Sequence, residues 1–335
     1  MPPRHLWSFQ VLRRPLPSPK SNRFRLAGIL LFGMLWGSLC HGHSQTPASL
    51  ATLLQECIDR ANAGDNSAAF NAVLNLAEAL GKAPLAEVKD VLPAIMQAVD
   101  DKNPAIRTLA LNSIVAIQSR SNPDRTLRGD ALPLLEPEIP RIAAHLTDDD
   151  THIRSTTANV LGGFGPKPPD TIFPPLIAYL KRDDAVSSVG SSIVFQLVRL
   201  DPQRPSVATA IIAFLNRNDQ TPDYLTSSID AIAHAPLQNE TINAAIVHHL
   251  DPPRPTAVRI AVIRDLPELQ LPGDVFTATQ AHLRQIAASE QEDAAIRSAA
   301  DSILPCWTND RQKPCPAFTL PPPTPESPNN FTDMD

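Results

Sequence analysis

An aspartate followed six residues later by an arginine recurs in this chain at a fixed shift. The pair occurs as Asp101 and Arg107 and again, 47 residues on, as Asp148 and Arg154. Guanidinium groups form charge-assisted hydrogen bonds with carboxylates and backbone carbonyls. The pattern therefore predicts either a ladder of hydrogen bonds between successive turns or a stripe that binds anions. Repetition favours the ladder, because every structural unit needs a packing contact.

Two later arginines continue the pattern. Arg259 and Arg297 lie in Ala-Val-Arg-Ile and Ala-Ile-Arg-Ser segments, where an apolar residue again comes directly before the arginine. Apolar or small residues also lie three and seven positions after each of the four arginines. Offsets of −1, +3 and +7 fall on one face of a helix. We therefore expect each arginine in the first turns of an amphipathic helix.

Other residue types give no pattern of catalysis or metal binding. The histidines beyond residue 44 lie at positions 145, 152, 234, 248, 249 and 282, without the spacing of a metal site. The glycine cluster Gly162-Gly163-Phe-Gly165 lacks the lysine and hydroxyl positions of a phosphate-binding loop. We expect no catalytic residue, no cofactor and no metal. Asn239-Glu-Thr fits a glycosylation acceptor if the source organism glycosylates.

Three cysteines remain beyond residue 44. Cys306 and Cys315 bracket a polar segment after the last helical pattern, and in an oxidising compartment we expect them to form a disulfide. The alternative is a metal pair, which would need two more soft ligands that no nearby His or Cys supplies. Cys57 lies within an apolar helical pattern and is expected to be a buried small hydrophobic residue.

The elements that hold these residues are repeated helix pairs. Each unit reads as a helix, a short turn rich in Asp, Asn and Pro, and a second helix. Six units keep register between residues 85 and 304, and residues 50–61 and 68–80 form a further pair that we expect to cap the N-terminal end. The sequence thus predicts an all-α solenoid of about seven antiparallel helix pairs.

These units resemble the HEAT repeats of the armadillo-like superhelices, with a Pro in the first helix, an Asp in the turn and a Val/Ile-Arg pair opening the second helix. The matching positions are Pro93, Asp101, Ile106 and Arg107, and then Pro140, Asp148, Ile153 and Arg154. Later units depart from the pattern, since Val189 and Tyr224 stand at the arginine position. The resemblance implies a right-handed superhelix with first helices on the convex side and second helices on the concave side.

The first 44 residues have the pattern of a secretory signal peptide. No Asp or Glu precedes Glu56, six Lys or Arg residues lie in the first 25 positions, and residues 26–39 carry no charge. Small residues at Gly42 and Ser44 suit cleavage before Gln45. A retained signal anchor and a lipidated Cys40 are the alternatives. We expect an exported protein, periplasmic or extracellular.

These patterns predict three regions in the chain: a signal peptide over 1–44, the helical repeats over 45–304, and a disulfide loop with a Pro-rich tail over 305–335. Cleavage would remove six of the 29 basic residues and none of the 35 acidic ones, which leaves a net charge of −12. So negative a chain repels phosphate backbones, and nucleic acid is not an expected partner.

The sequence therefore predicts a non-enzymatic exported scaffold that binds a protein or peptide on its concave surface. One alternative is an enzyme or accessory factor similar to the bilin lyases, some of which contain HEAT-like repeats. Another is an envelope assembly factor that contacts the membrane, which requires residues 26–39 to remain attached as an anchor.

Overall fold

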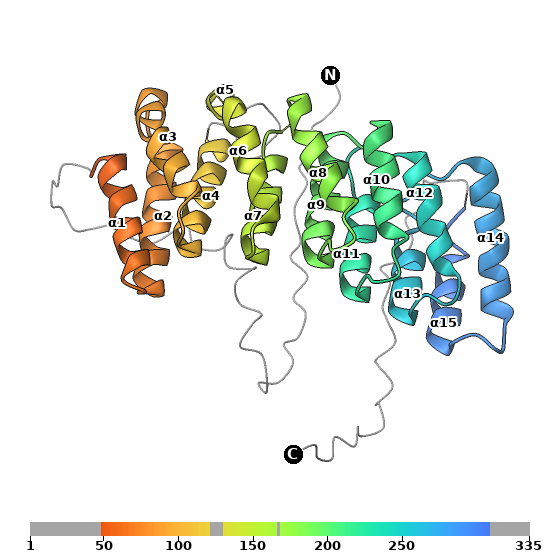
Figure 1. Cartoon of the computed structure of the whole chain (residues 1–335). Helices are drawn as coiled ribbons and strands as arrows, with labels where there is room; N and C mark the ends of the chain where they lie inside the picture. The colour runs from red at the N-terminus through yellow and green to blue at the C-terminus, as the bar shows by residue number, and fades with distance from the viewer. Residues whose placement is uncertain (1–47, 121–129, 166–167, 309–335) are drawn as a thin grey trace, which may run out of the picture. The chain divides into compact units, whose positions relative to one another are not determined.

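The computed structural model describes residues 48–120, 130–165 and 168–308 (Figure 1). These residues contain helices and turns and no strand, which confirms the predicted all-α solenoid. In this part of the chain the helices form seven hairpins, numbered here in chain order. They are α1 (Leu50–Asn62) with α2 (Asn66–Lys82), α3 (Leu85–Val99) with α4 (Pro104–Ser119), α5 (Leu132–Leu135) and α6 (Ile139–Ala144) with α7 (Thr151–Gly162), α8 (Phe173–Leu180) with α9 (Ser187–Leu200), α10 (Pro205–Leu215) with α11 (Pro222–Ala233), α12 (Glu240–Val247) with α13 (Thr256–Asp265), and α14 (Gly273–Ala288) with α15 (Ala294–Ile303).

The helices lie in two layers. The second helices pack successively on one another in the order α2, α4, α7, α9, α11, α13 and α15 (Figure 1). The first helices α8, α10 and α12 pack in the same way in the other layer. Short 3-10 turns extend several first helices, namely η2 (Glu136–Glu138), η3 (His145–Thr147), η4 (Asp170–Ile172) and η5 (His248–Leu250). Packing between successive units is what a solenoid requires to bury a continuous core.

Short polar side chains start many of the helices. The carboxylate of Asp150 accepts a hydrogen bond from the first turn of α7, and Asn103 does the same for α4. Asp293 caps α15 in this way. Such caps satisfy backbone amides that have no partner within the helix. The Asp, Asn and Pro residues seen in the sequence between units therefore set where the second helices begin.

The apolar stripes beside the repeated arginines lie in the core. The residues one position before each arginine are all buried, namely Ile106, Ile153, Val258 and Ile296. Seven positions after it, Ile114, Leu161 and Leu266 are buried, whereas Leu304 at the end of the last hairpin is half-buried. Among the described residues, no further hairpin follows α15 to cover this position, which explains the difference.

Parts of the prediction lie outside the described residues. These are the predicted signal peptide over 1–44, Cys315 and the Pro-rich tail. Within the described ranges, no helix has the length and hydropathy needed to span a bilayer. The boundaries at 44 and 304 therefore stay predictions.

Candidate functional site

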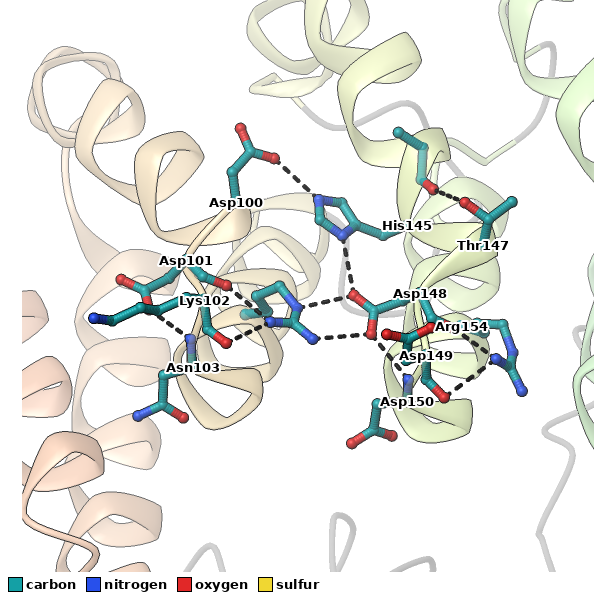
Figure 2. A network of polar contacts seen from close by, with 12 residues as sticks. Asp100, Asp101, Lys102, Asn103, His145, Thr147, Asp148, Asp149, Asp150 and Arg154 are labelled. Carbon is teal, nitrogen blue, oxygen red and sulfur yellow. Dashed lines mark hydrogen bonds and ion pairs between the residues drawn. The ribbon is translucent and has the colours of Figure 1, made fainter.

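Arg107 of α4 joins two turns. Its Nη1 atom donates hydrogen bonds to the carbonyl oxygens of Asp101 at 2.9 Å and Lys102 at 3.0 Å, in the turn of its own hairpin. Its Nη2 donates to Oδ1 of Asp148 at 2.9 Å, and its Nε lies 2.8 Å from Oδ2. Figure 2 shows Asp101, Lys102 and Asp148 around this contact. The guanidinium thereby ties the turn of hairpin 2 to the turn of hairpin 3.

The two repeated aspartates shape their own turns. Oδ1 of Asp101 accepts from the Asn103 amide at 2.7 Å, and Oδ1 of Asp148 accepts from the Asp150 amide at 3.0 Å. Burial would raise the pKa of Asp148, but hydrogen bonds from Arg107 and the Asp150 amide outweigh it, so the pKa lies below its usual range. The Asp148 carboxylate is therefore ionised, and both of its oxygens are held by contacts within the protein.

Arg154 holds only the turn of its own hairpin. Its Nη1 donates to the carbonyl oxygens of Asp148 at 2.5 Å and Asp149 at 3.4 Å, and its Nη2 donates to Thr151 Oγ1 at 2.8 Å. No hydrogen bond or ion pair in the described ranges joins Arg154 to Asp183, where a continuous ladder would place one. The carbonyl of Asp183 instead accepts from Nη2 of Arg217 at 2.9 Å.

Arg259 and Arg297 differ from each other in the same way as Arg107 and Arg154: the first links two hairpins and the second contacts its own turn. Arg259 is 5% exposed and pairs with both carboxylate oxygens of Glu292, at 2.7 and 2.5 Å, across hairpins 6 and 7. It also donates to the carbonyl of Leu250 in its own hairpin. Arg297 donates to the carbonyls of Ser289, Glu290 and Glu292 in its own turn, at 3.3, 3.2 and 2.9 Å. The described contacts thus include links between hairpins from Arg107 and Arg259, but not from Arg154 or Arg297.

Sequence reasoning missed Glu292 and Arg217. Arg217 lies just after the first helix α10 and reaches back to the preceding hairpin, donating to the carbonyl of Arg182 at 2.6 Å as well as to Asp183. It also pairs with Asp219 at 2.5 Å. Neither residue stands at the aspartate or arginine position of the repeat. Only the Arg217-x-Asp219 spacing in the polar turn after α10 could have pointed to this contact.

The exposed faces of α4 and α7 are largely uncharged. Beyond Arg107 and Arg154 with its neighbour His152, α4 and α7 carry no ionisable side chain. Asn112 of α4 and Asn159 of α7 are exposed, and Gln196 of α9 donates to Asn159 Oδ1 at 2.9 Å. One turn away, the hydroxyls of Ser155 and Ser192 lie 3.0 Å apart. Amides and hydroxyls therefore line this face.

Two adjoining helices of this layer, α9 and α11, each expose an aromatic side chain. Phe195 of α9 is 43% exposed, with the Arg199 guanidinium 5.1 Å from its ring centroid. Tyr224, at the start of the adjoining helix α11, is 42% exposed. We call the exposed surface of α4, α7, α9 and α11 the second-helix face, marked by Asn112, Asn159, Phe195 and Tyr224. Packing between the helices does not require these two aromatic rings to be exposed at the surface.

Hollows in the surface lie on the first-helix layer. Cavities of about 530 and 470 Å³ follow the groove between α8 and α10 and share Lys181. Arg204 in the larger one is engaged by Asp170 at 2.6 Å and stacks 3.8 Å from the Phe173 ring centroid. Throughout the described ranges, no group of three or more His, Cys, Asp or Glu side chains could hold a metal ion.

Two residues singled out in the sequence have structural surroundings. Cys57 is buried, and desolvation raises the pKa of its thiol to about 11, so it is a poor nucleophile at neutral pH. The Asn239 side chain caps α12: its Oδ1 accepts from the Thr241 amide at 2.9 Å, and its Nδ2 donates to the Pro202 carbonyl at 2.8 Å. The side-chain amide of Asn239 is therefore engaged in hydrogen bonds within the folded chain.

Of the two cysteines predicted to form a disulfide, Cys306 lies among the described residues. Sγ of Cys306 lies 3.1 Å from the carbonyl oxygen of Ile303, and Cys315 lies outside the described residues. The neighbouring Trp307 is buried against Phe276, with ring centroids 4.6 Å apart. The Cys306–Cys315 disulfide therefore stays a prediction. The tryptophan beside Cys306 is well packed.

Comparison with known proteins yields solved structures alone. No family model matches the chain, and no curated protein matches it significantly. An engineered protein is similar at 13% identity, with 74% of this chain and 66% of that chain covered and a TM-score of 0.43. A designed armadillo repeat protein in complex with peptide (KR)4 is 14% identical, with 76% and 97% covered and a TM-score of 0.34. A second designed armadillo repeat protein is 15% identical, with 76% and 98% covered and a TM-score of 0.31.

Proposed function

We propose that this chain is an exported HEAT-like scaffold that binds a protein or peptide along its second-helix face. The observation that carries the proposal is the exposure of Phe195 and Tyr224 on adjoining second helices. Aromatic side chains are enriched at the centres of protein interfaces, where they bury a large area for few rotatable bonds. A stack of helices offers such residues on one continuous surface.

The chemistry of the face indicates the kind of partner. The amides of Asn112 and Asn159 can both donate and accept hydrogen bonds, as the backbone of an extended segment requires. Few charges lie on α4 and α7, so attraction between unlike charges contributes little around these two amides. We therefore propose an extended, weakly charged protein segment as the partner, held by aromatic anchors and side-chain amides.

The proposed export rests on the signal-like segment over 1–44 and on the predicted Cys306–Cys315 disulfide. The N-terminal sequence of the protein isolated from its native host tests it directly. A chain that starts at Gln45 supports export with cleavage. A chain that retains residues 26–39 favours the anchored alternative and makes the membrane a partner.

The binding proposal is tested by cross-linking and affinity capture of the C-terminally tagged full chain in its native host. Phe195→Ala with Tyr224→Ala is compared with the parent, and Leu237→Ala is the matched control, because Leu237 is an exposed apolar residue in the turn after α11. We expect one protein that the parent and the control capture and the double variant loses. Equal capture by all three, or by none, would exclude the second-helix face as the binding surface.

A further inference from the structure

A histidine stands between two hairpins, with a carboxylate at each ring nitrogen. Nε2 of His145 lies 3.1 Å from Oδ1 of Asp100, the residue that ends α3 in hairpin 2. Nδ1 lies 3.4 Å from Oδ2 of Asp148, in the turn of hairpin 3 (Figure 2). The imidazole is 14% exposed. His145 therefore connects the turn of hairpin 2 to the turn of hairpin 3.

Its protonation state decides how many of these contacts are hydrogen bonds. A neutral imidazole has one N–H group, so one of the two carboxylates would face a nitrogen lone pair. The imidazolium has two N–H groups and can donate to both carboxylates. The geometry around His145 is thus complementary to the protonated ring.

Arginines of α4 and α6 bind the same two carboxylates as this ring. Arg141 of α6 pairs with Oδ2 of Asp100 at 2.6 Å, which leaves Oδ1 to His145. Arg107 of α4 shares Asp148 with the imidazole. The remaining ionisable side chains on α7 and α8, which also pack against η3, are His152, Arg154 and Tyr179. The two arginines keep both aspartates ionised, because they lower the pKa values of Asp100 and Asp148 despite the burial that opposes this.

We propose that His145 is a pH-dependent clamp between hairpins 2 and 3, closed when its ring is protonated. The clamp joins Asp100 to Asp148 in mildly acidic solution and loses one of its two hydrogen bonds in alkaline solution. Its action is independent of any partner on the second-helix face. A histidine is the side chain suited to this change, because its charge alters between pH 5 and 8.

The first test compares melting of the full chain with that of His145→Gln at pH 5.5 and pH 8.5. We expect the parent to melt at a higher temperature than the variant. This difference in melting temperature should be roughly 2–4 °C larger at pH 5.5 than at pH 8.5. The matched control is His152→Gln, on the exposed surface of the same hairpin. Taking the difference between parent and variant removes the contribution of distant ionisable groups.

A second measurement keeps the clamp testable if His145→Gln folds poorly. Imidazole nitrogen NMR of the ¹⁵N-labelled parent should show both nitrogens of His145 protonated at pH 5.5. At pH 5.5, Asp100→Asn, which leaves Asp148 in place, should change the Nε2 signal of His145 more than the His152→Gln control does. A parent–variant melting margin independent of pH, or His145 nitrogen signals that Asp100→Asn leaves unchanged, would overturn the clamp.

Discussion

Arg107 and Arg154 occupy the same position in two hairpins and make different contacts. Arg107 reaches the carboxylate of the next hairpin, whereas Arg154 donates only within its own turn and to Thr151. Asp148 presents its carboxylate to Arg107, whereas no contact in the described ranges joins the Asp183 side chain to Arg154. Identical sequence spacing thus leads to two different sets of contacts.

Arg107→Ala should lower the free energy of unfolding by about 2 kcal/mol, because it leaves the buried Asp148 carboxylate without its main partner. Arg154→Ala should lower it by about 1 kcal/mol, since only bonds within one hairpin are lost. Urea unfolding at pH 7 followed by circular dichroism measures both. The Arg107→Ala effect should shrink as the pH falls through the lowered pKa of Asp148, because protonation of that carboxylate removes the stability that its ionised form contributes. Equal effects of the two substitutions at pH 7 would contradict the link between hairpins.

His249 makes an opposite contribution to the pH dependence. Its side chain is 1% exposed, neither ring nitrogen has a hydrogen-bond partner among the described residues, and desolvation lowers its pKa to about 4. The unfolded chain therefore binds a proton near pH 6.5 that the folded chain does not, and stability falls as the pH drops from about 6.5 to about 4. The full loss is about 3 kcal/mol.

His249→Leu should remove this part of the acid sensitivity, so that the variant loses less stability than the parent between pH 7 and pH 4. Urea unfolding at several pH values measures the change. His234→Leu is a suitable control, because His234 is exposed on the surface. If the parent and His249→Leu lose stability in parallel over this range, His249 is protonated in the folded chain and the assignment is wrong.

At the scale of elements, close helix packing depends on small residues at defined points. Gly190 of α9 lies against the Phe214 ring of α10, and a Cβ atom there would be 2.1 Å from the ring. The helix conformation itself does not require glycine at this position. The contact between hairpins 4 and 5 does, because Phe214 fills the space a side chain would occupy.

Gly190→Ala should destabilise the protein by about 1–3 kcal/mol through overpacking against Phe214. The matched control is Gly81→Ala in α2, where nothing lies within 4 Å of the added methyl group. That substitution should raise stability by about 0.5–1 kcal/mol, since alanine favours the helix. Thermal unfolding distinguishes the two, and a neutral Gly190→Ala would show that α9 and α10 can shift apart freely.

At the scale of the whole molecule, the C-terminal end of the helical stack is closed by Trp307. Its ring packs on Phe276 of α14, and its carbonyl accepts a hydrogen bond from Gln280 at 2.8 Å. Terminal units of a solenoid need such a cover, because no further unit buries their apolar side. The predicted disulfide of Cys306 would hold this residue in place.

Trp307 is the only tryptophan after residue 44, so its fluorescence reports on this end of the stack in the processed chain. Reduction of the predicted Cys306–Cys315 bond should change the Trp307 emission and release two thiols, while the circular dichroism of the helices stays the same. Cys315→Ser is the control, and its emission should match that of the reduced parent. An unchanged emission together with an unchanged thiol count would exclude the disulfide.

The residue pattern alone was sufficient for the class of fold. Prolines and short polar residues between apolar stripes predict helix pairs, and the offsets beside Arg107, Arg154, Arg259 and Arg297 identify core positions that, except for the half-buried Leu304, are buried in the structure. This works because each hairpin is a local element whose apolar period is read directly along the chain. The signal-like segment, the net charge of the processed chain and the positions of the cysteines are likewise read directly from the sequence.

Contacts between hairpins required the tertiary structure. The acceptors of Arg107 and Arg259 lie 41 and 33 residues away, so their choice depends on how neighbouring turns meet. The same holds for His145 between Asp100 and Asp148, and for the exposed rings of Phe195 and Tyr224 on adjoining helices. Sequence periodicity specifies which face of a helix is buried, whereas the partner of a polar side chain depends on the rotation and offset between hairpins, which only their packed side chains decide.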